Sequence, residues 1–287
     1  MHILISGASG FVGMAAVRYF TARGHKVTAI VRSPGTADAD DELVWDISRQ
    51  AQPERLPDDV DAVVHLAQSR NYRAFPGDVD EMFRVNVVGA QNLLALAQRL
   101  GVSRFCLMST GSVYEPYAGN LNEQDLVQPA GYLGASKAAA EVLAHAYSAH
   151  FPISTLRLFF PYGPHQRQRL IPDLAGRVAR GEAIQLGADA LGLAITPIYV
   201  DDVCQIIQAS LDQAWQGIVN VASPEVLTIR DIATTFGTAL GKEPVFEVTD
   251  RPSPRIVPDT QKLLSLMPGM SFTPFSAGAG QLVRSGV

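Results

Sequence analysis

Three glycines that directly follow a short apolar segment constrain the fold of this chain most strongly. Residues 3–6 have the length and composition of a strand, and Gly7, Gly10 and Gly13 follow before an amphipathic stretch. Such glycines allow a tight turn, bring the backbone close to a pyrophosphate and let the helix pack on the strand. The N–H groups at the helix N-terminus then bind phosphate. We therefore predict a dinucleotide site that includes Gly7, Ser9, Gly10, Phe11, Val12 and Gly13.

Short apolar segments alternate with amphipathic segments over the first half of the chain. The apolar segments have strand length, and they are residues 3–6, 26–31, 62–66, 104–109 and 154–160. Helical stripes of apolar residues lie between them, and one of these stops at Gly101, a residue that ends helices well. Strands that are apolar throughout, each followed by a helix, are typical of a parallel sheet covered on both faces. We expect an α/β fold with a Rossmann-type, doubly wound parallel sheet.

Prolines divide the second half of the chain into shorter segments. Residues 195–203 resume the strand-then-helix pattern, so the chain is expected to return once to the sheet. We predict two parts. The Rossmann domain that binds the cofactor comprises residues 1–164 and about 195–210, and a small C-terminal α/β lobe that binds substrate comprises residues 165–194 and 211–287.

Composition excludes several classes of protein. Hydrophobic residues make up 47% of the chain and charged residues 18%, unlike a disordered or fibrous protein. The formal charge of −5 and the lack of basic runs argue against nucleic acid as a partner. We expect no leader and no membrane span. We also expect no metal site, because the histidines are scattered along the chain. Two cysteines, Cys106 and Cys204, fit a reduced, cytoplasmic protein.

Further motifs accompany the glycine pattern, whose spacing is G-x-x-G-x-x-G. They are Asp46-Ile47, His65-Leu66-Ala67, Asn86 with Gly89, Ser109-Thr110-Gly111-Ser112-Val113-Tyr114, Gly134-Ala135-Ser136-Lys137 and Ile198-Tyr199-Val200-Asp201-Asp202-Val203. With them the chain resembles the extended branch of the short-chain dehydrogenase/reductase superfamily, the epimerase/dehydratase type. The resemblance covers most of the chain, and the C-terminal part matches only loosely. It implies an enzyme with a Rossmann fold and a nicotinamide cofactor.

The end of the second expected strand indicates which cofactor is preferred. An NAD-specific protein of this fold has an acidic residue about twenty residues after the glycines, where it binds the ribose hydroxyls. Here the strand ends at Val31, and Arg32 and Ser33 follow. Because a guanidinium pairs with phosphate through two hydrogen bonds, we predict NADP rather than NAD, bound by Arg32 and Ser33. A solvated arginine is the alternative. By resemblance, further cofactor contacts are Asp46, Ile47, Leu66, Ala67, Lys137 and Phe159.

The resemblance implies three catalytic groups, a hydroxyl, a tyrosine and a lysine. Thr110 matches the hydroxyl that orients the substrate, and Lys137 matches the lysine that binds the nicotinamide ribose and lowers the pKa of the tyrosine. Leu133 occupies the tyrosine position, four residues before the lysine, and Tyr132 stands one residue earlier. One residue on a helix is a rotation of about 100°, which would turn this ring away from the nicotinamide. The departure puts ordinary ketone or alcohol redox chemistry in question.

Three interpretations of the missing tyrosine stay open. In the first, Gly131 and Gly134 let the start of the helix slip, and Tyr132 reaches the site from a frayed turn. In the second, another group moves the proton, and the candidates are Tyr114, Tyr162, His165, Tyr72 and Arg70. In the third, the protein binds its cofactor without chemistry. Lys137 fits all three, because a ribose contact serves binding as well as catalysis.

Substrate contacts are expected at Gln68, Thr110, Ser112, Phe160 and Tyr162. In the epimerase family an asparagine often stands where this chain has Phe160, and an arginine precedes the position of Pro197, where this chain reads Ala194-Ile195-Thr196. Both changes remove polar contacts to a diphosphate and suggest a smaller or more apolar substrate.

The sequence thus predicts an NADP-dependent oxidoreductase or epimerase-like enzyme that acts on a small molecule with altered acid–base groups. The alternatives are an NADP-binding sensor and a non-redox isomerase or lyase without net hydride transfer. The resemblance also implies a homodimer through helices at residues 86–100 and 136–149. A monomer would bury one face of each helix against the sheet as well, so both oligomeric states stay open.

Overall fold

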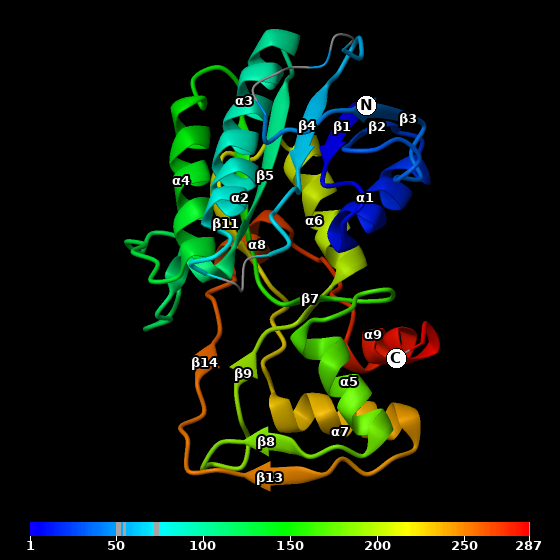
Figure 1. Ribbon diagram of the computed structural model, residues 1–287, viewed down its shortest axis with the longest axis vertical. Coiled ribbons are helices and arrows are strands. Elements are labelled where there is room, and N and C mark those ends of the chain that lie inside the picture. The colour runs from blue at the N-terminus through cyan, green and yellow to red at the C-terminus, as the bar shows by residue number, and fades with distance from the viewer. Residues whose placement is uncertain (50–52, 54–55, 72–74, 287) are drawn as a thin grey trace. The chain divides into compact units, whose positions relative to one another are not determined.

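The computed structural model describes residues 1–286 except 50–52, 54–55 and 72–74 (Figure 1). The chain forms two compact units. The first unit comprises residues 1–118, 123–158 and 204–220, and the second comprises residues 119–122, 159–203 and 221–287. The division differs from the expected one, because residues 195–203 belong to the second unit and residues 211–220 to the first.

The first unit contains a seven-stranded sheet. Its strand order is β11-β6-β5-β4-β1-β2-β3, and the pairs from β6 to β3 are parallel. The strands are β1 (His2–Ser6), β2 (Lys26–Val31), β3 (Asp41–Val44), β4 (Ala62–His65), β5 (Arg104–Thr110), β6 (Ile153–Leu158) and β11 (Gly217–Val221). The order reverses between β1 and β4, and ligands of such sheets bind at the carboxyl ends of the strands at this point. The expected doubly wound Rossmann fold is confirmed.

Helices cover both faces of this sheet (Figure 1). The helices α3 and α4 pack beside β4 and β5, and α1 packs on β1 and β2. A buried cluster that includes Leu4, Val63, Leu93 and Phe105 fills the space between helix and sheet. The helical segments are α1 (Phe11–Thr21), α2 (Val79–Phe83), the π-helix η1 (Arg84–Val88), α3 (Gly89–Leu100), the 3-10 helix η2 (Gly111–Tyr114), α4 (Tyr132–Ala146) and α6 (Val200–Asp212).

The second unit is built from short strands and four helices. The strands form three small sheets, β10 (Ile198–Tyr199) with β7 (Pro161–Tyr162), β8 (Ile184–Leu186) with β13 (Phe246–Val248), and β9 (Ala194–Ile195) between β12 (Leu227–Thr228) and β14 (Arg255–Ile256). The helices are α5 (Leu170–Arg180), α7 (Ile229–Leu240), α8 (Gln261–Leu266) and α9 (Phe275–Arg284). Tyr162, Phe236 and Phe275 lie at the centre of its core.

The pairing of β7 with β10 explains the position of the boundary. Pro161 pairs with Ile198 and Tyr162 with Tyr199, so residues 195–203 stay with the segment that follows β6. The chain returns to the first unit within α6, and β11 then adds to β6 at the edge of the large sheet. Within the described part of the chain, no helix has both the length and the apolar character needed to cross a membrane.

Candidate active site

The loop between β1 and α1 has the backbone that the glycine pattern predicts. Gly7 has a φ of 72°, and the Gly10 N–H donates to its carbonyl at 2.9 Å. A Cβ on Gly7 would lie 2.6 Å from the Ala67 nitrogen, and one on Gly13 would collide with the Gly7 carbonyl oxygen. Glycine is therefore required at both positions, because backbone atoms fill the space that a side chain would need.

The N-terminus of α1 is available to an anion. Gly10 is its N-cap, no side chain caps it and its first turn holds no acidic residue. Ser9 is exposed, whereas Phe11 and Val12 are partly buried. The free N–H groups and the helix dipole at such an end favour negative charge, so this loop fits a pyrophosphate.

Basic and acidic residues surround the end of β2. Arg32 and Ser33 are both exposed directly after the strand. Glu42 accepts hydrogen bonds from the loop that follows, and these lower its pKa, the largest cause being the bond from Gly35 with those from Ala37 and Thr36 adding to it. Asp46 accepts a hydrogen bond from the Ser48 hydroxyl. Burial acts to raise the pKa of Asp46, but the hydrogen bonds from Ser48 and the charges of Arg49 and Arg32 together outweigh burial and lower it. Both carboxylates thus have partners within the chain.

The segment after β4 and the Asp46-Ile47 motif after β3 both follow the carboxyl ends of parallel strands, so they lie at the same edge of the sheet. Leu66, Ala67 and Gln68 follow β4 and are partly buried. Ile47 is buried, and its carbonyl accepts from the Asn92 amide at 2.8 Å. Since Gly7 touches Ala67, these segments meet the glycine loop directly.

Lys137 is buried and joins two strand ends. It is 2% exposed, and its Nζ donates to the Met108 carbonyl at 2.9 Å and to the Ala67 carbonyl at 3.4 Å. Burial lowers its pKa to about 8, against the opposing effect of Glu141. His65 is fully buried nearby. Its Nδ1 bonds Ser6 at 2.6 Å, its Nε2 has no partner among the described residues, and burial and then the charge of Lys137 lower its pKa to about 3.

Thr110 and Ser112 lie at the junction of β5 and η2. The Thr110 hydroxyl accepts from the Ser112 N–H at 3.2 Å and caps η2. A Cβ on Gly134 would collide with the Ser112 carbonyl oxygen, so η2 touches the first turn of α4 through a glycine. The hydroxyls of Thr110 and Ser112 therefore lie near the start of the helix that carries Lys137.

The start of α4 bears on the interpretation in which Tyr132 reaches the site from a frayed turn. Helix α4 begins at Tyr132, earlier than expected, and the Ala135 N–H donates to the Gly131 carbonyl at 3.0 Å. The first turn is thus hydrogen-bonded, whereas the slipped-helix interpretation required a frayed one. The Tyr132 ring stacks on Phe75 with centroids 5.6 Å apart. Leu133 is the second residue of a regular helix, and its carbonyl accepts from Ser136.

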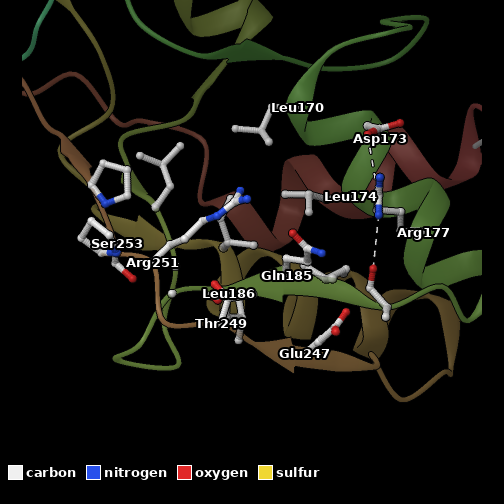
Figure 2. Close-up of a pocket in the computed structure, with 18 residues that line it drawn as sticks. Leu170, Asp173, Leu174, Arg177, Gln185, Leu186, Glu247, Thr249, Arg251 and Ser253 are labelled. Carbon is white, nitrogen blue, oxygen red and sulfur yellow. Dashed lines mark hydrogen bonds and ion pairs between the residues drawn. The ribbon is translucent and has the colours of Figure 1, made fainter.

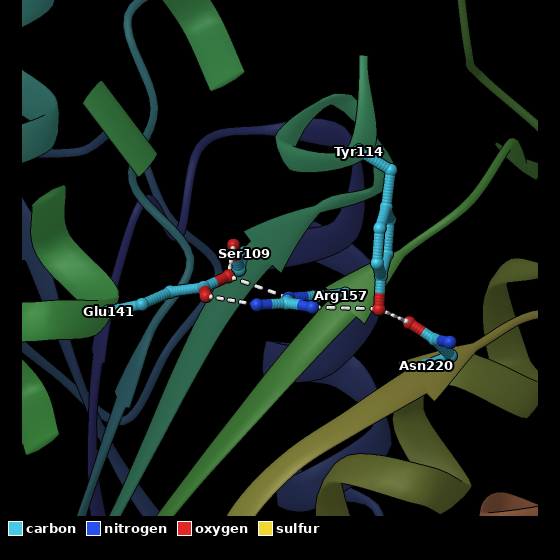
Figure 3. A network of polar contacts seen from close by, with 5 residues as sticks. All are labelled: Ser109, Tyr114, Glu141, Arg157 and Asn220. Atoms are coloured by element: carbon cyan, nitrogen blue, oxygen red, sulfur yellow. Dashed lines mark hydrogen bonds and ion pairs between the residues drawn. The ribbon is translucent and has the colours of Figure 1, made fainter. Parts of the chain in front are cut away.

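A buried ion-pair network holds the middle of α4 against the sheet (Figure 3). Glu141 receives two hydrogen bonds from Arg157, with Nη2 to Oε2 at 2.7 Å and Nε to Oε1 at 3.1 Å, and a short one from Ser109. Arg157 also donates to the Tyr114 hydroxyl, which itself donates to Asn220. Tyr114, one of the candidates for proton transfer, thus serves this network.

The other candidates belong to the second unit, to an exposed position of the first unit, or to residues outside those described. Tyr162 is buried in the second unit, where burial raises its pKa and its hydroxyl has no partner among the described residues. Phe159 is buried and Phe160 partly buried at the start of that unit, and His165 is exposed. Arg70 is exposed in the first unit, and Tyr72 lies outside the described residues.

The second unit also has a pocket that the sequence did not predict (Figure 2). Its volume is about 570 Å³, and α5, β8, β13 and the loop at residues 251–254 line it. Leu170, Leu174 and Leu186 give it apolar walls. Its charged lining residues are Asp173, Arg177, Glu247 and Arg251, and Arg177 is paired with Asp173 at 3.7 Å. Arg251 lies in a proline-rich segment that has no motif of its own. The pairing of β8 with β13 brings this segment to the pocket.

The comparisons with known proteins identify the family. The model of the NAD dependent epimerase/dehydratase family matches residues 3–222. The chain belongs to this family. The resemblance to extended short-chain dehydrogenase/reductases is therefore confirmed, and the protein is an enzyme of the epimerase/dehydratase type.

Curated relatives of this family member share about a quarter of its residues. The low-salt glycan biosynthesis protein Agl12 of Haloferax volcanii is 28% identical over 78% of this chain and 77% of its own. The dTDP-glucose 4,6-dehydratase of Streptomyces griseus is 28% identical over 84% of this chain and 79% of its own. The UDP-glucuronic acid decarboxylase 5 of Arabidopsis thaliana is 26% identical over 82% of this chain and 73% of its own.

Solved structures have the same fold. MoeE5 in complex with UDP-glucose and NAD aligns with a TM-score of 0.84 at 24% identity, over 99% of this chain and 98% of that one. The UDP-N-acetylglucosamine 4-epimerase from Bacillus cereus aligns with a TM-score of 0.83 at 25% identity, over 100% of this chain and 97% of that one.

No group of histidine, cysteine and acidic residues suited to a metal ion is found in the described part of this chain.

Proposed function

We propose that this family member binds NADP at the glycine loop and transforms a hydroxyl-bearing carbon of a nucleotide-linked sugar or a closely similar small molecule. One observation carries the proposal. Lys137 is buried and donates to the carbonyls of Ala67 and Met108, and Ala67 lies against the glycine loop that fits a pyrophosphate. A lysine without a partner ligand is costly to bury, so its position is best explained by a cofactor ribose and a substrate.

The residues present fit the cofactor. Backbone atoms around Gly7 and Gly13 leave no room for side chains, and the α1 N-terminus has no internal cap. By family resemblance, Lys137 would bind the nicotinamide ribose and Thr110 would orient the substrate oxygen. The bound nicotinamide supplies hydride transfer. The chain itself has to hold the substrate oxygen, exclude water and move one proton.

The preference for NADP over NAD rests on Arg32. It is exposed directly after β2, where a phosphate on the ribose would lie, while Glu42 and Asp46 are engaged by groups of the chain. The MoeE5 structure named above contains NAD, so the preference for NADP is a property that we propose for this chain alone.

The proposed substrate class rests on the relatives and on the pocket of the second unit. The relatives' names refer to dTDP-glucose and UDP-glucuronic acid. Arg251 can pair with an anionic group, whereas Arg177 already pairs with Asp173, and the leucines of the pocket suit a flat ring. Phe160 and Ile195 are apolar at positions where the family often has polar contacts to a diphosphate. We therefore propose that Arg251 contributes more to the binding of the diphosphate in this chain.

Cofactor titration tests the first half of the proposal. We expect NADPH to bind about tenfold or more tightly than NADH, because one charged hydrogen-bonded contact contributes about 1.5–3 kcal/mol. Arg32→Ala should remove this preference and leave NADH binding unchanged, while Arg99→Ala on the remote face of α3 should change neither. Equal binding of both cofactors by the unaltered protein would refute the preference.

Substrate turnover tests the second half. The protein is incubated with NADP or NADPH and with UDP-glucose, UDP-glucuronic acid or dTDP-glucose, and both the cofactor absorbance and the sugar product are followed. Net change of the cofactor supports an oxidoreductase, and product without net change supports an epimerase or lyase. Arg251→Ala should raise KM with kcat retained, and the exposed Arg255→Ala serves as its control. Tight NADPH binding without conversion of any sugar would support the sensor instead.

A homodimer through α3 and α4 remains a proposal. Val142 on α4 is 71% exposed and Phe83 at the end of α2 is 48% exposed, so apolar side chains are exposed on α4 and on the helix that precedes η1 and α3. Light scattering of the unaltered protein and of Val142→Glu distinguishes a dimer from a monomer.

A further inference from the structure

We propose that Tyr117 and Glu115 supply the acid–base group that the family resemblance places at position 133. The inference rests on the proposed function, because it assigns the proton transfer of that reaction. Tyr117 is not among the earlier candidates, and it lies twenty positions before Lys137, whereas the family's tyrosine lies four positions before the lysine. Three independent observations support it: a hydrogen-bonded chain, its place against α4, and the conformation of Tyr117.

The hydrogen-bonded chain connects Glu115 with the substrate hydroxyl candidates. The Tyr117 hydroxyl donates to Glu115 Oε1 at 3.0 Å and lies 3.3 Å from Ser112 Oγ. The Ser112 N–H in turn donates to the Thr110 hydroxyl at 3.2 Å. The phenol, the carboxylate and the Ser112 hydroxyl are therefore hydrogen-bonded in one set in the first unit, and the Ser112 backbone places the Thr110 hydroxyl near it. Such a set can pass a proton over short distances.

The set lies against the first turn of α4. A Cβ on Gly131 would collide with Glu115 Oε2, and a Cβ on Gly134 would collide with the Ser112 carbonyl oxygen. Leu133 lies between these two glycines. Glu115 thus lies against the N-cap of α4, and Ser112 lies against Gly134, which is three residues before Lys137 and therefore on the same side of the helix. The two glycines of this turn are needed for the approach.

The backbone of Tyr117 is held in an unusual conformation. Its φ is 54°, in the left-handed region that bulky residues rarely adopt. The Tyr117 N–H donates to the Tyr114 carbonyl at 2.8 Å, and the side-chain bonds to Ser112 and Glu115 fix the ring. Strained residues of this kind are found where a side chain must be aimed at a site.

Other phenols of the first unit are engaged differently. Tyr114 is tied to Arg157 and Asn220, and the Tyr132 ring stacks on Phe75. Tyr117 is partly buried, and burial, followed by the charge of Glu115, raises its pKa to about 12 against the opposing bond from Ser112. The phenol is therefore protonated near neutral pH, so it needs an acceptor before it can take a proton. Glu115, the one charged group among the described residues that shifts this phenol, is that acceptor.

The proton path balances in the direction of alcohol oxidation. The substrate O–H bond breaks and its proton moves to the Tyr117 oxygen, while the proton of Tyr117 moves to Glu115 Oε1. The substrate carbon loses its hydrogen with both electrons to the nicotinamide, so the alcohol becomes a carbonyl and the cofactor is reduced. Glu115 ends as a carboxylic acid. In the direction of reduction, the same two protons return.

Phenol titration of the protein without ligand tests the dyad separately from turnover. The ultraviolet absorbance of the phenolates is followed against pH for the unaltered protein, Glu115→Gln and Glu115→Gln/Tyr117→Phe, with circular dichroism to verify folding. We expect Glu115→Gln to make one phenol ionise at lower pH, because the negative charge that raises its pKa is gone. That phenol should be missing in the double variant. No shift on Glu115→Gln would overturn the dyad.

Kinetics then test its role. Tyr117→Phe should lower kcat by about 10²–10⁴-fold, the usual contribution of a general acid–base group, with NADPH affinity unchanged. Glu115→Gln should lower kcat and flatten its pH profile, and Glu115→Asp should restore part of both. Tyr147→Phe, at the far end of α4, is the matched control. Full activity of Tyr117→Phe, or loss confined to Tyr132→Phe, would overturn the proposal.

The two experiments separate this inference from the proposed function. If NADPH does not bind or no sugar is converted by the unaltered protein, the proposed function is wrong, and the assignment of a proton transfer to Tyr117 is overturned with it. If turnover is found and Tyr117→Phe retains it, only the assignment of Tyr117 is wrong.

Discussion

The N-termini of α1 and α4 are alike in sequence and local geometry but differ in what faces them. Each has an extended glycine N-cap, Gly10 or Gly131, and neither has a side-chain cap or an acidic residue in its first turn. Backbone of the glycine loop surrounds the first, which leaves its N–H groups to an external anion. The Glu115 carboxylate lies against the second. One helix end thus fits a cofactor phosphate, and the other holds a group of the chain itself.

This difference indicates how the two ends divide the work of the site. A helix N-terminus favours negative charge whatever its source. At α1 that charge is expected to come with the cofactor, so the position binds. At α4 it comes from the chain, so it can orient Glu115 and with it Tyr117. Gly13→Ala and Gly131→Ala test this comparison directly, the first with the largest expected effect on cofactor binding, and two further predictions concern the buried charges of α4.

The largest effect is expected from a side chain added at the α1 end. Gly13→Ala would place a Cβ against the Gly7 carbonyl oxygen and the Ala8 Cα, which are backbone atoms that cannot give way. Cofactor affinity should fall by at least a hundredfold, and unfolding should become easier by about 1–3 kcal/mol. The control is Gly280→Ala on α9, where a Cβ meets only the flexible Arg284 at 3.4 Å. Unchanged NADPH titration of Gly13→Ala would contradict this role of the loop.

A large loss of stability is expected in the middle of α4. Glu141→Gln leaves the buried Arg157 without its ion pair, so the free energy of unfolding should fall by about 3–5 kcal/mol. Glu141→Leu/Arg157→Met should recover most of it, because both charges are then absent. Denaturant unfolding measures all three proteins. A double variant as unstable as the single one would show that the network does more than pair two charges.

A dependence of stability on pH is expected from Lys137. Burial lowers its pKa in the folded protein to about 8, below the ordinary lysine value of 10.5. Between these values the unfolded chain binds more protons, so the free energy of unfolding rises with pH, by roughly 3 kcal/mol over the interval. Lys137→Met should lack this rise, whereas Lys242→Met on the exposed end of α7 should keep it. If the free energy of unfolding changed with pH in the same way for the unaltered protein and for Lys137→Met, the burial of a charged lysine would be contradicted.

A smaller effect is expected at the α4 end. Gly131→Ala should displace the Glu115 side chain, which is flexible, rather than unfold the helix. We expect kcat to fall with NADPH affinity unchanged, the reverse of the result for Gly13→Ala. Measuring both quantities on both variants compares the two helix ends directly. If Gly131→Ala weakened the cofactor as much as Gly13→Ala, the division of work between them would be wrong.

The features that the sequence revealed are those set by local pattern. The glycine loop, the alternating strands and Lys137 follow from residues close together in the chain, and the parallel sheet follows from their order. The start of α4 was expected later, because Gly131 and Gly134 are poor helix formers and the packing of η2 and Glu115 on them is not visible in a single segment.

The features that were missed depend on contacts between segments. Tyr117 has no characteristic spacing from Lys137, and its position follows from a left-handed residue in the loop after η2. The boundary of the second unit depends on the pairing of β7 with β10, two-residue strands that no periodicity predicts. The pocket around Arg251 arises where β8 and β13 come together from distant parts of the chain.

A crystal structure with NADP tests the central claim most directly, because it shows which phenol lies beside the reactive carbon of the nicotinamide. We expect the pyrophosphate at the N-terminus of α1, Lys137 on the nicotinamide ribose, and the Tyr117 hydroxyl, still bonded to Glu115, as the phenol nearest C4. A structure in which the Tyr132 hydroxyl occupies that place, or in which Tyr117 points away from the cofactor, would contradict the account.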